Sequence, residues 1–323
     1  MKFVRRAAAW AVAAVVMLAG ANAAHAQDAK YPTKKVDFIV AFAAGGFADT
    51  LARFVAQKLN ESWGQSVVIE NRGGAGGNLG ARAVRSAAAD GYTVLVTTTA
   101  LAINPTMYRR LDFTLDELAA VAIPAASPET IAAHPSKAPG GLKEFIAANK
   151  DREVTFASAG VGSGSHLAAE YFFREHAKTK ALHVPFRGGS PAIQAVLGNQ
   201  VDLIASSFGV TSQVVDGKLK GLAVASPSRN PAMPDVPTYK ESGFDFEAES
   251  WVGFFVPAKT DPAVVTFLNS AINAIVTEAA GRDHLSKLGF RLTPRSVAET
   301  QAYLKSEVGK WSTMVKAVGV YVD

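Results

Sequence analysis

Short apolar runs alternate with amphipathic segments in the first third of the chain. The runs that predict strands are 36–42, 67–70 and 92–98. Between the first two runs, Leu51, Val55 and Leu59 recur at the spacing of one face of a helix. A second helix is predicted at 81–88. Strands separated by single helices usually pair in parallel, so this order predicts a mostly parallel, doubly wound α/β sheet.

The same alternation restarts in the middle of the chain. The further strands are predicted at 154–158, 182–186, 201–206, 219–225 and 251–257, and the intervening helices at 166–176, 190–197 and 211–216. Asp261-Pro262 begins another helix. A capping box of Ser296 and Glu299 opens the last one. A chain of 323 residues with a restarted pattern predicts two α/β domains.

The first 26 residues have the pattern of a cleavable export signal. Lys2, Arg5 and Arg6 precede an apolar stretch at 7–19, and Ala24-His25-Ala26 fits a small-x-small cleavage site. The apolar stretch is shorter than the ~20 residues that cross a bilayer. We therefore expect a mature protein that is free in the periplasm, without a stable membrane anchor.

Composition removes several classes of site. The chain has no cysteine, which excludes disulfides, thiolate metal sites and a lipid-modified N-terminal cysteine. The formal net charge is +5, but the basic residues are scattered and form no stripe, so nucleic-acid binding is disfavoured. The histidines show no metal-binding spacing, and the glycine-rich segment 74–80 lacks the acidic residue of a dinucleotide site. We expect no metal and no cofactor.

Three glycine- or serine-rich turns each follow a strand and lead into a helix, at 43–50, 158–166 and 186–191. A helix N-terminus carries unpaired N–H groups and partial positive charge, which favours an anion. In open α/β sheets, ligands bind at this edge. The candidate binding residues in these turns are Ala43, Gly45, Gly46, Phe47, Asp49, Ser158, Gly162, Ser163, Ser165, His166, Arg187 and Gly188.

Several of these residues also have a purely structural interpretation. Each turn by itself could simply use glycine to reverse the chain. Asp49 could stabilise a helix dipole, and Phe47 could pack between helix and sheet. Arg187 could pair with a carboxylate of the ligand or be solvated at the rim.

A secreted hydrolase is an alternative function. Ser163 or Ser165 would be the nucleophile and His166 the base, with Asp202 or Asp49 as the orienting acid. Neither serine lies in the G-x-S-x-G motif of a nucleophile elbow, which favours a binding role for this turn.

The sequence resembles the periplasmic solute-binding proteins of tripartite tricarboxylate transporters, often called the Bug family. The resemblance covers essentially the whole mature chain. The matching motifs are Tyr31-Pro32, Gly45-Gly46 with Asp49, Trp63-Gly64-Gln65, Glu70-Asn71-Arg72, Gly74 to Gly77, Asp90 to Thr93, Ala102 to Pro105, Ser163 to His166, His183 to Pro185 with Gly188, Asp235 to Thr238, and Trp251.

The resemblance implies a two-lobed periplasmic-binding-protein fold of type II, or Venus flytrap. It implies a monomer that captures a small carboxylate without catalysis and delivers it to an inner-membrane permease. Lobe 1 would comprise 27–124 and 252–323, and lobe 2 would comprise 125–251. By position, the family also implicates Thr98, Thr99, Ser206 and Ser207 in binding. A subunit that presents its ligand to a membrane kinase is a further alternative.

The first turn departs from the family pattern P-F-P-P-G-G, because it reads Ala41-Phe-Ala-Ala-Gly-Gly46. Without the prolines, the turn is less preorganised or roomier. The ligand could accordingly be an aliphatic di- or tricarboxylate, as in the family, or a bulkier aromatic carboxylate.

Overall fold

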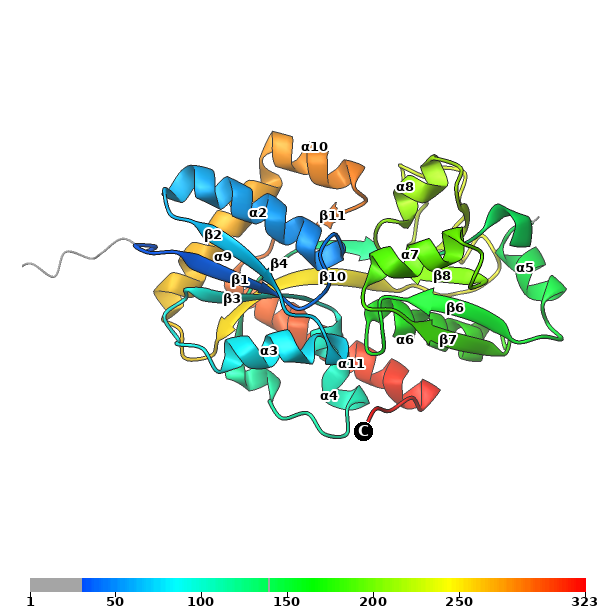
Figure 1. Cartoon of the computed structure of the whole chain (residues 1–323), viewed down its shortest axis with the longest axis horizontal. Helices are drawn as coiled ribbons and strands as arrows, with labels where there is room; N and C mark the ends of the chain where they lie inside the picture. The colour runs from blue at the N-terminus through cyan, green and yellow to red at the C-terminus, as the bar shows by residue number, and fades with distance from the viewer. Residues whose placement is uncertain (1–30, 139) are drawn as a thin grey trace, which may run out of the picture. The chain divides into compact units, whose positions relative to one another are not determined.

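The computed structural model describes residues 31–138 and 140–323, of which residues 35–323 form one compact unit (Figure 1). The predicted export signal, 1–26, and its cleavage site lie outside the described residues. In the described part, no single helix is long and apolar enough to cross a bilayer; α9 (Pro262–Thr277) and α10 (Ala279–Lys287) meet that test only as a pair, with a 71° bend between them.

Two sheets organise this unit. The first has six strands in the order β11-β4-β10-β3-β1-β2. Its strands are β1 (Val36–Val40), β2 (Val67–Asn71), β3 (Thr93–Thr98), β4 (Leu118–Pro128), β10 (Glu249–Pro257) and β11 (Arg291–Leu292). The second has five strands in the order β7-β6-β8-β5-β9. They are β5 (Thr130–Ala133), β6 (Val154–Ser158), β7 (Ala181–Pro185), β8 (Leu203–Ser206) and β9 (Lys220–Val224).

Both sheets are mixed, which corrects the expectation of mostly parallel sheets. The βα repeats do pair in parallel: β1 with β2 and β3, and β6 with β7 and β8. The strands that bring the chain from one sheet to the other instead pair antiparallel, as β10 does with β3 and β4, and β5 with β8 and β9. No helix precedes β5 or β10 in the connection from the other sheet. Parallel pairing usually requires a crossover helix, so these strands pair antiparallel.

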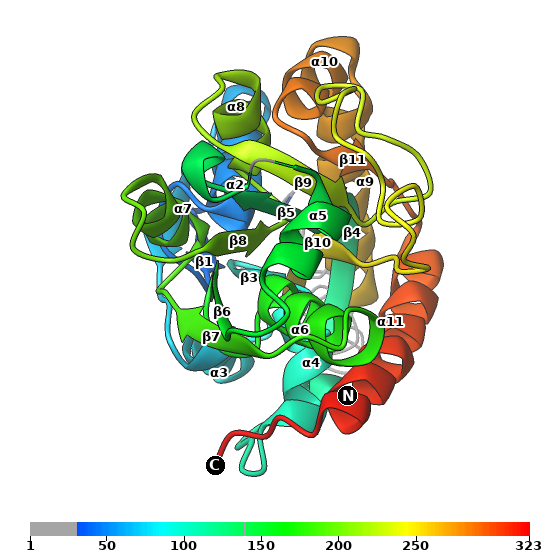
Figure 2. The same cartoon turned by 90° about the vertical axis from the view of Figure 1, so that its right-hand side faces the viewer.

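Helices cover the faces of both sheets. The further α-helices are α2 (Phe47–Trp63), α3 (Asn78–Arg85), α4 (Ala100–Met107), α5 (Leu142–Ala148), α6 (Gly164–Tyr171), α7 (Gly189–Leu197), α8 (Val210–Val215) and α11 (Val297–Val318). In Figure 1, α2 lies above the first sheet and α3, α4 and α11 lie below it. Figure 2, turned by 90°, shows the second sheet with α5 and α6 in front and α7 at its left side.

The chain connects the two sheets twice. Glu129 is the single residue between β4 and β5, and the chain returns through 225–248 into β10. The two connections pair with each other, because the Glu129 N–H donates to the Ala248 carbonyl and the Ala225 N–H donates to the Glu129 carbonyl. The adjoining ends of β4 and β10 are paired in the antiparallel ladder. The lobe boundaries at 124/125 and 251/252 stay predictions; β4 and β10 run through both positions without a break.

A buried carboxyl ties the last helix to the first sheet. Trp251 of β10 and Trp311 of α11 are fully buried, and both indole N–H groups donate to the same Oε2 of Glu307, at 3.0 and 2.9 Å. The face that α11 turns to the core includes Trp311, Val315 and Val318, which are buried. The two tryptophans thus satisfy their polar atoms inside an apolar core.

Replacing Glu307 by leucine should leave both indole N–H groups without an acceptor. We expect a loss on the order of 3 kcal/mol in the free energy of unfolding, measured by urea denaturation. Glu307→Gln retains a carbonyl acceptor and should cost under about 1 kcal/mol. Equal stability of the two variants would contradict this role of the carboxyl oxygen.

Candidate functional site

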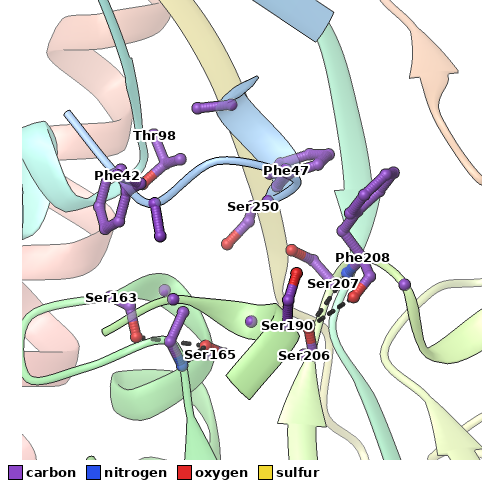
Figure 3. A pocket seen from close by; sticks show the side chains of 18 of the residues that line it. Phe42, Phe47, Thr98, Ser163, Ser165, Ser190, Ser206, Ser207, Phe208 and Ser250 are labelled. Atoms are coloured by element: carbon purple, nitrogen blue, oxygen red, sulfur yellow. Dashed lines mark hydrogen bonds between the residues drawn. The ribbon is translucent and has the colours of Figure 1, made fainter. Parts of the chain in front are cut away.

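A small, partly open cavity of about 70 Å³ lies where turns from both sheets meet (Figure 3). Its walls include parts of the predicted turns at 43–50, 158–166 and 186–191, and also the turn after β8, which was not among them. The predicted residues that line it are Ala43, Gly45, Gly46, Phe47, Thr98, Ser163, Ser165, Gly188, Ser206 and Ser207. The other predicted residues, Asp49, Thr99, Ser158, Gly162, His166 and Arg187, do not line it.

Asp49 supports the first turn from behind. Its buried carboxylate accepts hydrogen bonds from the Gly45 N–H and from Arg53 Nε, both at 2.8 Å, and from Asn71 Nδ2 at 2.8 Å. Gly45 has a φ of 73°, a conformation that favours glycine. Asp49 therefore fixes the backbone that faces the cavity and has its oxygens committed to protein partners.

The pKa of Asp49 lies below its ordinary value. Burial opposes ionisation, but the hydrogen bonds from Arg53, the Gly45 N–H and Asn71 together outweigh it. The carboxylate is thus charged at neutral pH, and its role in the turn does not change over the physiological range.

The turn after β6 is built around α6. The Ser163 hydroxyl caps the helix by accepting from the His166 N–H at 3.2 Å, and it donates to the Gly160 carbonyl at 2.7 Å. Ser165 Oγ lies 3.2 Å from Ser163 Oγ. Both serines line the cavity, whereas the His166 ring is buried behind them and accepts from the Gly162 N–H at 3.4 Å.

Two histidines stack behind the cavity wall. The rings of His166 and His183 lie 3.9 Å apart between centroids, at an interplanar angle of 25°. Burial lowers the pKa of His166 to about 4. Burial, and then the charge of His166, lower the pKa of His183 to about 3. Both rings are neutral at pH 7.

The arrangement expected of a hydrolase is not assembled in the described residues. The close histidine–serine contact here is Ser158 Oγ to His183 Nε2, at 2.6 Å, but Ser158 is fully buried and also bonded to the Gly160 backbone. Asp202 pairs with Lys137 and Arg152 instead of a histidine.

Arg187 and Thr99 lie away from the cavity. Arg187 is exposed and lines a neighbouring groove with the glycine-rich segment 73–77 and Tyr108. In the described part of the chain no carboxylate forms an ion pair with it. The Thr99 hydroxyl accepts from the Trp251 N–H at 2.8 Å, which joins α4 to β10.

Further lining residues were not among the named candidates. Five lie inside the predicted turns, namely Ala48, Ala159, Gly164, Gly189 and Ser190; the other five, Phe42, Ile193, Phe208, Gly209 and Ser250, lie outside them. Phe208 and Gly209 follow β8 as the predicted turns follow their strands, so the same rule could have found them. Ser250 lies within a strand, and no turn pattern marks it. The Ser190 hydroxyl donates to the Gly45 carbonyl at 3.3 Å, which joins the turns of the two sheets.

Aromatic rings form one end of the site. Phe47 stacks on Phe290 at 5.0 Å between centroids and contacts Phe208 at 5.6 Å. Figure 3 shows Phe47 and Phe208 side by side at one end, with Ser163 and Ser165 at the other. Phe47 thus both lines the cavity and packs on neighbouring rings.

The cavity wall carries polar groups but no charged side chain among the described residues. Its side-chain hydroxyls are those of Thr98 and of the serines at 163, 165, 190, 206, 207 and 250. Four of them, at 163, 190, 206 and 250, donate their proton to protein oxygens, which leaves Thr98, Ser165, Ser207 and the backbone N–H groups as the remaining donors. Gly164 and Ser165 begin α6, whose first N–H groups face outward from the helix. No group of three potential metal ligands occurs among the described residues. The wall therefore offers neutral hydrogen-bond donors, as a small anion requires.

The two-lobed α/β fold is that of the periplasmic binding proteins. The family model described as the tripartite tricarboxylate transporter family receptor matches residues 51–320, so the chain belongs to this family. It is 32% identical to the protein BugT of Bordetella pertussis over 90% of each chain. It is 31% identical to a protein from the tcbD–tcbE intergenic region of a Pseudomonas species, over 94% of this chain and 91% of that protein. These relatives make it a protein of the Bug type.

Solved structures agree with this assignment. The periplasmic binding protein BugD is 32% identical, with a TM-score of 0.84 over 90% of this chain and 99% of BugD. An R. palustris protein solved with adipate has a TM-score of 0.86 at 27% identity, over 90% of this chain and 98% of that protein. MatC of Rhodopseudomonas palustris, solved with bound malate, has a TM-score of 0.81 at 31% identity, over 88% of this chain and 100% of MatC.

The histidine pair should make the protein sensitive to mild acid. Unfolded histidine titrates near its ordinary value of about 6.5, while folded His166 resists protonation down to about 4. The unfolded state therefore binds more protons in this interval, so the full stability is present above about pH 6.5 and is lost as the pH falls.

We expect His166→Asn to remove about 2 kcal/mol of the stability difference between pH 7 and pH 5, measured by urea denaturation at both values. His284→Gln is the matched control, because His284 is an exposed histidine on α10. The expectation is wrong if His166→Asn and His284→Gln lose stability equally on acidification.

Proposed function

We propose that this protein captures a small carboxylate in this cavity and delivers it to a membrane permease. The observation that carries the proposal is the cavity wall, where hydroxyl and backbone donors from both sheets converge without a charged side chain. Dipolar donors stabilise a carboxylate while leaving it free to dissociate. Relatives of the same fold that were solved with adipate and malate support this ligand class.

The proposed ligand-binding residues are those of the predicted set that line the cavity, together with Ser190, Phe208 and Ser250. Asp49, Ser158 and His166 would support these residues from behind, through the contacts described above. Arg187 would act only on a ligand that extends into the neighbouring groove.

Capture without chemistry is the proposed mode of action. In the described residues, no histidine ring nitrogen forms a hydrogen bond with Ser163 or Ser165. The Ser158 hydroxyl does contact the His183 ring, but Ser158 is buried and does not line the cavity. A nucleophile must reach its substrate and have a base beside it. Closure around the acid and reopening at the permease would then complete the cycle.

The aromatic end of the cavity favours an aliphatic acid over an aromatic one. Phe47 already packs on Phe290 and Phe208, so an aromatic ligand would have to displace those contacts.

The family supports a periplasmic location, and the signal pattern at 1–26 would provide the export. Delivery to a permease, a monomeric state and the lobe boundaries at 124/125 and 251/252 are parts of the same proposal. A membrane kinase is the alternative recipient. Permease activity reconstituted in proteoliposomes, dependent on the loaded protein, would separate the two recipients.

Binding should be measurable with the intact protein by calorimetry and thermal shift. We expect malate or adipate to raise the melting temperature, since a ligand of the folded state stabilises it. Ser165→Ala should weaken binding about tenfold through loss of one hydroxyl donor. Ser212→Ala, on exposed α8, should not.

The proposal would be abandoned if no short carboxylate bound, or if esters of such acids were turned over. Binding of benzoate in preference to every aliphatic acid would leave the carrier function intact and overturn the preference for aliphatic acids.

A further inference from the structure

Glu129 occupies the shorter of the two connections between the sheets. Its N–H donates to the Ala248 carbonyl at 3.0 Å, and its carbonyl accepts from the Ala225 N–H at 2.8 Å. Both partners belong to the returning connection, so the backbone of Glu129 hydrogen-bonds the shorter connection to the longer one. Its side chain is 3% exposed.

The carboxyl group of Glu129 is only half satisfied. Oε1 accepts from the Ser250 hydroxyl at 2.5 Å, while Oε2 is buried without a hydrogen-bond partner among the described residues. No Lys, Arg or His in the described part of the chain forms an ion pair with it. A buried carboxylate with neither a cation nor full hydrogen bonding is costly, so the neutral form is favoured.

The neighbours of this carboxyl do not supply a compensating charge. Tyr239, from the returning connection, is fully buried, and its pKa lies well above the ordinary value through burial and the charge of Glu129. From α6, Gly164 lies so close that a Cβ there would overlap the Ser250 hydroxyl and come within 3.2 Å of Glu129 Oε1. His166 on the same helix is neutral above about pH 4. Burial raises the pKa of Glu129 to about 8, against the opposing effect of the Ser250 hydrogen bond.

Ser250 connects this carboxyl to the cavity, because it also lines the cavity wall. A serine hydroxyl has a single proton to donate. When Glu129 is ionised, that proton is committed to Oε1, and Ser250 presents only lone pairs to an anionic guest. When Glu129 is protonated, the carboxyl can donate to Ser250 Oγ instead, and the serine proton becomes available to the guest.

We propose that Glu129 is a positioning residue that acts through Ser250, so that binding of a carboxylate guest is coupled to one proton held at the connection between the sheets. This inference rests on the proposed function. The proton comes from solvent and stays on Glu129 while the guest is bound. Because coupling is reciprocal, the guest strengthens proton binding and the proton strengthens guest binding.

The test measures the affinity for malate and adipate between pH 7 and pH 9, where both acids are fully ionised. In the wild-type protein we expect the affinity to fall above about pH 8, approaching tenfold per pH unit. Glu129→Gln should bind with an affinity independent of pH over this range, because its amide N–H donates to Ser250 as the protonated carboxyl would. Ser250→Ala should also lose the pH dependence, with weaker binding.

Calorimetry in two buffers of different ionisation enthalpy counts the protons directly. We expect the wild type to take up close to one proton per guest at pH 9 and Glu129→Gln to take up none. Glu249→Gln is the matched control, since Glu249 precedes Ser250 on β10 but forms a partly exposed ion pair with Arg291. It should retain the wild-type profile.

Guest binding without proton uptake, or an unchanged pH profile in Glu129→Gln, would overturn this inference and leave the carrier function standing. Failure of every acid to bind the wild type at any pH would overturn the carrier function itself. If Glu129→Gln does not fold, the proton count in the wild type and in Ser250→Ala decides the question.

Discussion

The antiparallel pairing of β4 with β10 is the interaction on which the site depends. The ladder spans the first sheet and continues to the point where the chain leaves it, so its register fixes both connections at once. Ser127 at this end donates to the Ser207 carbonyl at 2.5 Å, and Trp251 donates its N–H to Thr99. The β4–β10 ladder thus positions Ser250 and Ser207, which line the cavity, relative to the turns of both sheets.

Local structure follows well from the sequence where periodicity is strong. The strands of the two βα repeats and the long helices at 47–63 and 297–318 match the apolar spacing to within a few residues. No strand was predicted for β4, which contains Pro124 and Pro128, and a lobe boundary was instead predicted inside it, at 124/125. The ladder accommodates Pro124 through an irregularity between Val252 and Phe254, opposite that proline.

The candidate site was predictable only in part, for a geometric reason. Turns that follow strands gather at one edge of a sheet, so the rule located Gly45, Ser163 and Gly188. The rule cannot tell which atoms of a turn face inward. Asp49 and His166 point away from the cavity and support it, while Ser250 enters it from a strand. Glu129 carries no local pattern, and its position depends on contacts distant in the sequence.

The two lobes also touch each other directly, through Phe47 with Phe208 and through the Ser190 hydroxyl on the Gly45 carbonyl. Such contacts involve no atom of the cargo. Their free energy is the same whichever acid is enclosed, so they tighten retention of every acid equally and contribute nothing to choosing among them. Selectivity must then come from the surface that faces the ligand. Phe47 and Phe208 also belong to that surface, so changes at the aromatic pair should alter both residence time and preference.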